Sequence, residues 1–173
     1  MAVLREKELY ANQKKFQFAR ERVEYLGHII SQQGVEIDPK KVRAMLEWPV
    51  PKKMKEVQGF LGLSGYYRRF VQNYGCVAAT LTQILKGGTF RWTEDAQLAF
   101  EKLKTTMMML PVLALPDFNR PFKVETDASG YGIGVVLVQQ KRSITFYSHT
   151  LSLQDHTKLV YERELLVVVM VMQ

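Results

Sequence analysis

The residues with the clearest chemical character form one short run, Tyr66 to Phe70. Its sequence, YYRRF, combines three aromatic rings with two arginines. Such mixtures bind nucleic acids, because rings stack on bases and guanidinium groups contact phosphates. A second interpretation starts from the helix, in which positions i and i+4 share one face. Tyr66 and Phe70 would then pack in the core, while Arg68 and Arg69 are solvated. These residues alone leave both interpretations open.

Metal and disulfide chemistry have little support in the sequence. The chain has three histidines and one cysteine, Cys76, and their positions lack the short spacings of a zinc site. A single cysteine cannot form an internal disulfide, which favours a reducing compartment. No two aspartates are adjacent anywhere in the sequence. A paired-aspartate turn that holds two magnesium ions is therefore absent, and we expect no polymerase activity.

The net charge of +7 is distributed unevenly along the chain. Residues 1–121 contain 19 basic and 12 acidic side chains, whereas residues 122–173 contain 5 of each. The surplus of positive charge in the first part suits a polyanionic partner. An ordinary solvated basic surface would have the same composition, because the charges are spread and form no solid run.

Composition and hydropathy indicate a globular protein that does not enter membranes. Hydrophobic residues make up 47% of the chain and charged residues 24%, and no apolar run reaches the roughly eighteen residues of a membrane helix. The chain starts without the apolar segment of a secretory signal, which favours the cytoplasm or nucleus over secretion. Residues 9–20 are basic and acid-free, as in a mitochondrial targeting peptide, but Glu6 and Glu8 argue against that. The compartment stays unassigned.

The first part of the sequence predicts one β-hairpin among several helices. Residues 2–15 have a helical pattern, and period-two apolar residues predict a hairpin over 16–31, with glycines at its turns. Asp38 and Pro39 are suited to cap and start a helix. A second helix is expected from about Met54 towards Asn73, ended by Gly75, and a short helix follows over 77–85. A further helix begins at the cap Thr93. Its apolar stripe is Ala96, Ala99, Phe100, Leu103, Met107 and Leu110.

From Phe122 onward the pattern changes to strands. Apolar residues alternate over 122–126, 133–137 and 144–148, and a helix is expected from about Lys158. The order is β-β-β-α with tight antiparallel connections. The predicted fold class is therefore α+β.

Several segments of the sequence occur together in one known family. They are, in order, VEYLGHIIS (23–31), GFLGL (59–63), YYRRF (66–70), FRWT (90–93), LPVL (110–113), ETDASGYGIG (125–134), FYS (146–148) and YERELL (161–166). With these motifs in this order, the whole chain resembles the Pol polyprotein of Gypsy-class (metavirus) LTR retrotransposons, where reverse transcriptase joins ribonuclease H. The resemblance also implies a plant source.

The resemblance implies a division into four parts. Residues 1–37 would be the palm-end helix and a primer-grip-like hairpin, and residues 38–85 thumb-like helices. Residues 86–121 would be a connector helix and linker, and residues 122–173 a truncated ribonuclease H-like β-β-β-α unit. The residues it implies in contact with nucleic acid, an RNA–DNA hybrid in particular, are Tyr25, Gly27, His28, Tyr67, Arg68 and Arg69.

Two carboxylates match the ribonuclease H pattern. Asp127 and Glu164 correspond to the first two of four acids that hold a pair of magnesium ions, and the other two have no counterpart in this sequence. Two carboxylates bind a divalent cation weakly, because hard cations need several oxygen ligands. We therefore expect a remnant site with at most weak Mg²⁺ binding and no cofactor. A pair of solvated carboxylates is the alternative.

The last ten residues, ELLVVVMVMQ, are strongly apolar. Left uncovered, such a helix beside an unpaired strand edge would bind another protein or self-associate. Three functions stay open: an inactive protein that acts by protein–protein interaction through residues 122–173, a nucleic-acid binder using the basic thumb, and a residual or complemented ribonuclease H. The expected interaction residues are Leu165, Leu166, Val169, Met170 and Met172.

Overall fold

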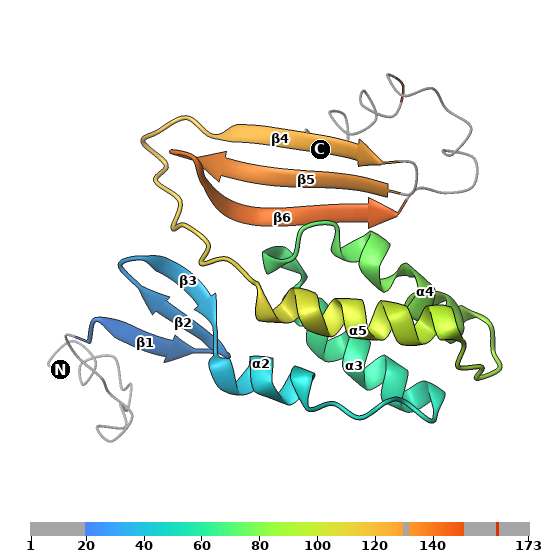
Figure 1. Ribbon diagram of the computed structural model, residues 1–173. Helices are drawn as coiled ribbons and strands as arrows, with labels where there is room; N and C mark the ends of the chain where they lie inside the picture. Colours follow the sequence, from blue (N-terminus) through green and yellow to red (C-terminus); the bar gives the residue numbers. More distant parts are fainter. Residues whose placement is uncertain (1–19, 130–131, 151–161, 163–173) are drawn as a thin grey trace, which may run out of the picture.

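The computed structural model describes residues 20–129, 132–150 and 162. These residues form a small N-terminal sheet, a layer of helices and a C-terminal sheet above the helices (Figure 1). This combination of helices and separate antiparallel sheets confirms the predicted α+β class. The helix predicted over 2–15, and the helix predicted from Lys158 except for residue 162, lie outside the described residues.

The N-terminal sheet consists of β1 (Arg22–Tyr25), β2 (His28–Ser31) and β3 (Gly34–Ile37), paired antiparallel in that order. The first two strands are the predicted hairpin. The third strand was not predicted, since Gly34 was interpreted as a turn residue. This strand has only four residues, which is too short for a period-two pattern to stand out from a loop.

The first of the described helices, α2 (Pro39–Leu46), begins where the sequence predicts it. Asp38 caps it, because its Oδ1 accepts a hydrogen bond of 2.9 Å from the backbone N–H of Lys40. Pro39 occupies the first helical position, where its missing N–H costs nothing.

The second helical region differs from the prediction of one helix ended by Gly75. Helix α3 (Met54–Tyr66) ends earlier, a 3₁₀ turn η2 (Arg68–Phe70) follows, and α4 (Tyr74–Lys86) contains Gly75. The break falls at Asn73, whose φ of 55° is left-handed. Asparagine tolerates this conformation better than most residues, so it can redirect the chain without glycine.

Helix α5 (Glu94–Met108) supplies much of the core. Thr93 caps it through its Oγ1, which accepts from the N–H of Ala96 at 3.2 Å. The predicted stripe is buried against the other helices, and the ring of Phe100 lies 4.6 Å from that of Phe60. The buried hydrophobic residues of the helical layer are Met45, Val57, Phe60, Tyr67, Phe70, Val71, Ala78, Leu81, Ala96, Phe100, Leu103 and Met107.

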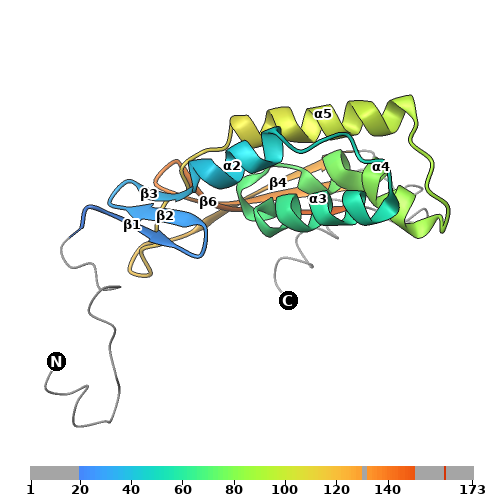
Figure 2. The same ribbon diagram turned by 90° about the horizontal axis from the view of Figure 1, so that it is seen from below.

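The C-terminal sheet consists of β4 (Lys123–Ser129), β5 (Gly132–Gln139) and β6 (Arg142–Thr150), antiparallel in sequence order as predicted. Strand β6 lies against α4 and η2, and β4 is the edge away from the helices. Seen from below, the helices lie between the viewer and this sheet (Figure 2). Within the described residues, no helix is long and apolar enough to span a membrane.

The two sheets are joined through the segment between α5 and β4. Leu113 forms an antiparallel bridge with Val35 of β3, with N···O distances of 2.8 and 2.9 Å. The next residue, Ala114, donates its N–H to the carbonyl oxygen of Ser143 at 2.8 Å. Residues 113–114, the bridge segment, therefore hydrogen-bond to the N-terminal sheet and to β6. A Cβ at Gly34 would lie 1.9 Å from the Leu113 carbonyl oxygen, so only glycine fits beside this bridge.

Gly34→Ala should destabilise the protein by about 2 kcal/mol or more, because φ of 134° and the Leu113 backbone both exclude a side chain. Gly62→Ala is the matched control. No atom lies within 4 Å of its Cβ position in the middle of α3, so it should stabilise by about 0.5–1 kcal/mol. Urea unfolding followed by circular dichroism measures both. Equal midpoints for the two variants would contradict the role of the bridge.

Candidate nucleic-acid interface

The turn between β1 and β2 is built to project outward. Leu26 and Gly27 have φ of 49° and 76°, both left-handed, as a two-residue type I′ hairpin turn requires. For leucine this conformation costs roughly 1–2 kcal/mol. Leu26 is nevertheless 68% exposed and Tyr25 61% exposed. The turn therefore presents two large side chains to solvent.

Two consecutive tyrosines at the end of α3 hold this turn. Tyr66 donates its hydroxyl to the carbonyl oxygen of Leu26 at 3.1 Å, and Tyr67 donates to that of Gly27 at 3.2 Å. The N–H of Asp38 also donates to Gly27, at 3.1 Å. A Cβ on Gly27 would lie 2.6 Å from the Tyr67 hydroxyl. The glycine is needed both for its conformation and for this contact.

His28 occupies the centre of an aromatic cluster beside the turn. Its ring centroid lies 5.5 Å from Tyr66, 5.4 Å from Tyr67 and 5.6 Å from Phe70. Its Nδ1 lies 3.1 Å from the carbonyl oxygen of Leu26, which makes this nitrogen the donor, since a carbonyl oxygen only accepts. The cluster fixes the hairpin against η2.

A line of exposed residues continues from the turn along α3. Those on α3 recur every three or four positions, so they lie on one face of the helix. Gly62 is in the middle, with open space where a Cβ would be, so another molecule can approach the helix backbone closely. The exposed stripe consists of Lys55, Gln58, Gly62 and Tyr66 on α3, followed by Arg69 on η2.

The structure corrects the assignment of the two tyrosines. Tyr67, a predicted nucleic-acid contact, is 1% exposed, whereas Tyr66 is 54% exposed. The alternative that placed Tyr66 in the core with Phe70 is also wrong. The reason is the helical phase of α3: its buried residues Val57, Phe60 and Ser64 recur every three or four positions, and this spacing leads to Tyr67, not Tyr66. A 3₁₀ turn follows the helix. With three residues per turn, Tyr67 and Phe70 share the buried face.

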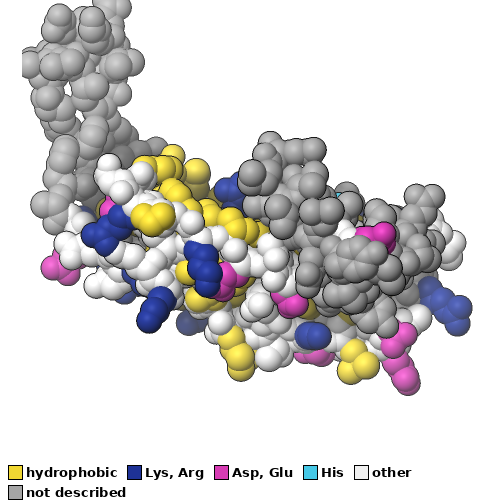
Figure 3. All heavy atoms as spheres, turned by 90° about the horizontal axis from the view of Figure 1, so that it is seen from above, with side chains coloured by type: hydrophobic (Ala, Val, Ile, Leu, Met, Phe, Trp, Pro, Cys, Tyr) yellow, Lys and Arg dark blue, Asp and Glu magenta, His cyan; other side chains and the backbone are white. Residues whose placement is uncertain are grey.

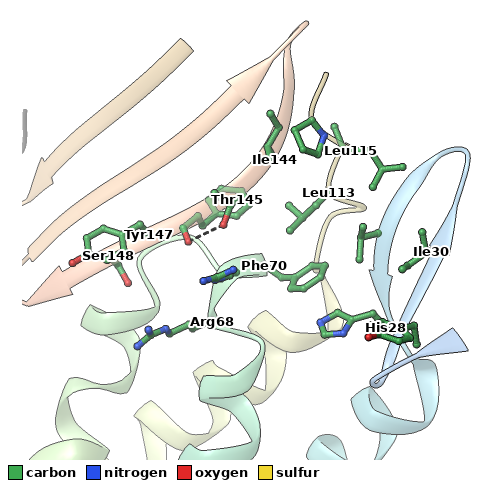
Figure 4. Close-up of a pocket in the computed structure, with 16 residues that line it drawn as sticks. His28, Ile30, Arg68, Phe70, Leu113, Leu115, Ile144, Thr145, Tyr147 and Ser148 are labelled. Atoms are coloured by element: carbon green, nitrogen blue, oxygen red, sulfur yellow. Dashed lines mark hydrogen bonds between the residues drawn. The ribbon is translucent and has the colours of Figure 1, made fainter. Parts of the chain in front are cut away.

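The other predicted contacts come together around one cleft. Tyr25, His28, Arg68 and Arg69 line a cavity of about 740 Å³ beside β6 (Figure 4). Gly27 contributes its backbone carbonyl to the turn. Sequence reasoning missed Lys55, Gln58 and Gly62, although their helical spacing with Tyr66 was a signal that could have found them.

The predicted remnant metal site is described only in part. Asp127 lies on β4, opposite Gly134 of β5, and is exposed. Glu164 lies outside the described residues, as does the expected interaction set Leu165, Leu166, Val169, Met170 and Met172. Over residues 20–129, 132–150 and 162, no group of three or more His, Cys, Asp or Glu side chains could hold a metal ion.

Comparison with known proteins finds similarity to reverse transcriptase domains and to retrotransposon polyproteins. Residues 92–173 match the family of RNase H-like domains found in reverse transcriptases. An uncharacterized mitochondrial protein of Arabidopsis thaliana is 54% identical over 117 residues, which cover 66% of this chain and 74% of that protein. The retrovirus-related Pol polyproteins of the Drosophila melanogaster transposons 297 and gypsy are 41% and 40% identical over 90% and 91% of this chain. The chain spans 15% and 16% of those two polyproteins.

Solved structures share the fold. The foamy viral protease-reverse transcriptase in complex with an RNA/DNA hybrid superimposes with a TM-score of 0.85, at 21% identity, over 92% of this chain and 22% of that chain. The same viral protein in complex with dsDNA gives a TM-score of 0.82, at 21% identity, over 88% of this chain and 33% of that chain.

Tyr67→Phe should cost about 1 kcal/mol of stability, because the carbonyl oxygen of Gly27 loses a hydrogen bond.

Burial, then the nearby Tyr66 and Asp38, raises the pKa of Tyr67 above 10.0. The neutral phenol is therefore favoured in the folded state. Its stabilisation is complete below pH 10 and declines as the pH rises through the folded-state pKa. Thermal unfolding between pH 8 and about 11.5 should show a smaller alkaline loss in Tyr67→Phe than in the wild type. An alkaline profile of Tyr67→Phe identical to that of the wild type would contradict this role.

Proposed function

Because this chain belongs to the reverse transcriptase and ribonuclease H family of Gypsy-class retrotransposon Pol polyproteins, we propose that its described part binds duplex nucleic acid, an RNA–DNA hybrid in particular. The observation that carries the proposal is the exposed stripe on α3 and its continuity with the β1–β2 turn. The turn and the stripe meet at Tyr66, whose hydroxyl donates to Leu26.

The stripe combines the groups that a duplex groove accepts. Gln58 offers both donor and acceptor atoms to sugars and base edges. Gly62 leaves room for the sugar-phosphate backbone next to the helix. Lys55 and Arg69, near the two ends, place positive charges where phosphates would lie on either side of the groove.

The turn adds a rigid contact beside this groove. Two tyrosine hydroxyls and one backbone N–H hold its carbonyl groups. Tyr25 and Leu26 therefore project from a fixed base, which reduces the entropy lost on binding. The solved structure with an RNA/DNA hybrid and this fold supports the choice of hybrid as ligand.

We also propose a second function, association with a protein or a second copy through residues 122–173. The supporting observation is exposed apolar surface at and before β4. Phe118 is 83% exposed, and its ring lies 6.0 Å from that of Phe122. Val124 on β4 is also exposed. Figure 3, a view from above the β4 side of the molecule, shows hydrophobic side chains at the surface next to Lys and Arg. Among the described strands, β4 has a neighbour on one side only.

In this proposal the chain alone does not cleave nucleic acid. It therefore needs no cofactor, because Mg²⁺ would take part in catalysis only at a complete ribonuclease H site. The support is that Asp127 belongs to no ligand cluster within the described part of the chain. Magnesium-dependent cleavage of an RNA–DNA hybrid, lost in Asp127→Asn, would contradict this.

Lys55→Gln with Arg69→Gln should weaken binding of a labelled RNA–DNA hybrid, measured by fluorescence anisotropy at several salt concentrations. Each lost phosphate contact lowers the slope of log K against log salt by about 1, so the double variant should lose about 2. The control is Lys86→Gln with Arg91→Gln. It removes the same charge from exposed residues outside the stripe, and its slope should stay at the wild-type value. If the slope fell equally in both variants, the effect would come from net charge alone, and the proposed interface would be contradicted.

Phe118→Asp with Phe122→Asp should abolish self-association in sedimentation velocity, because carboxylates cannot be buried in an apolar contact without cost. Leu98→Asp with Met108→Asp is the control, since both side chains are exposed on α5. A monomeric wild type, or equal behaviour of the two variants, would contradict self-association through β4.

A further inference from the structure

The cleft between the N-terminal sheet and β6 has the size and wall chemistry of a small-molecule site. Its volume of about 740 Å³ is within the range of ligand pockets in proteins, roughly 300–1,000 Å³. Figure 4 shows His28 on one side, Tyr147 on the other and Phe70 between them. These residues come from β2, β6 and η2.

The floor of the cleft is apolar. Ile30 and Val35 from the N-terminal sheet, Leu113 from the bridge segment and Ile144 from β6 line it. Phe70 and Leu113 are buried, so this surface is continuous with the protein core. A ligand that displaces water from such a floor must itself be largely apolar. The aromatic side chains Tyr25, His28 and Tyr147 along the walls favour a planar ring, because rings stack or meet edge to face.

The charged side chains that line the cleft are all positive. Arg68 and Arg69 are part of the lining, and no Asp or Glu is among the lining residues. The ion pairs found in the described part of the chain involve neither arginine. Two guanidinium groups beside an apolar floor complement an anionic group on an apolar ring system, since Arg binds carboxylates and similar planar anions bidentately.

The walls of the cleft are held in place before any ligand binds. The bridge segment is hydrogen-bonded to Val35 on one side and to Ser143 on the other. Ser148 accepts the N–H of Gly75 at 2.8 Å, which fixes β6 on α4. Arg142 donates to the carbonyl oxygen of Gln33, so the β5–β6 turn is tied to the β2–β3 turn. A preformed cleft loses little entropy when a ligand enters.

We propose that this cleft binds a small planar aromatic anion, with the rings on the apolar floor and the anionic group on Arg68 and Arg69. The site differs from the exposed stripe, because its floor is formed by residues of β2, β3, β6 and the bridge segment. The two sites share Arg69. The test of the cleft uses no nucleic acid, so its result does not depend on whether the chain binds a duplex.

Anilinonaphthalene sulfonate is a suitable probe, because it combines fused rings with one anionic group and fluoresces when it leaves water. Fluorescence titration of the full chain should show one class of site that Arg68→Gln with Arg69→Gln weakens about tenfold or more, as expected for lost charge-assisted hydrogen bonds. Lys86→Gln with Arg91→Gln removes the same charge elsewhere and should leave this affinity unchanged. The uncharged analogue phenylnaphthylamine should bind the wild type and the arginine variant equally.

A second variant tests the location without changing charge. Leu115 lines the cleft and is half-exposed, so Leu115→Trp should fill space in the cleft and weaken dye binding while the fold is retained by circular dichroism. Leu98→Trp, on exposed α5, should bind the dye as the wild type does. Naphthoate should displace the dye from the wild type. The proposal is overturned if the arginine and Leu115 variants bind the dye as the wild type does, because the dye would then be adsorbed on other apolar surface.

Discussion

The relative position of the two sheets depends on a pair of backbone hydrogen bonds between Val35 and Leu113. They are possible because Gly34 lets the Leu113 carbonyl approach to a distance that any side chain would block. Through this bridge, a segment that leaves α5 far along the chain becomes the second neighbour of β3, opposite β2, and then reaches β6. Buried backbone groups must be paired, so the bridge also satisfies polar atoms at the edge of the core.

The candidate interface depends on a second long-range contact of the same kind. A left-handed leucine is unfavourable in an isolated hairpin, and the β1–β2 turn is held by hydroxyl groups from residues that lie 40 positions later. The hairpin can therefore hold Tyr25 and Leu26 in a fixed, exposed position only while the end of α3 is folded. Folding of the helices and presentation of the turn are coupled for this reason.

Sequence patterns predicted the elements whose signals are local. The Asp38–Pro39 start of α2, the Thr93 cap of α5 and the three alternating strands after Phe122 were all found, because each depends on neighbouring residues. Strand β3 and the break at Asn73 were missed. Both the four-residue strand that begins at Gly34 and the left-handed asparagine depend on contacts with residues distant in the sequence. The tyrosines are a different case: the buried positions Val57, Phe60 and Ser64 recur with helical spacing and lead to Tyr67, so the longer sequence pattern did contain this signal.

The change of helical geometry also determines how the two proposed sites relate to each other. The 3₁₀ turn keeps Phe70 on the buried side, next to Tyr67, and leaves Arg68 and Arg69 exposed on η2. Arg69 then ends the stripe on α3 and also lines the cleft beside β6. One guanidinium group can fully neutralise one anion at a time, so a phosphate on the stripe and an anionic ring in the cleft would compete for Arg69. By linkage, occupancy of either site should lower affinity at the other. The coupling would be electrostatic and local, and it would need no movement of the sheets that the Val35–Leu113 bridge holds together.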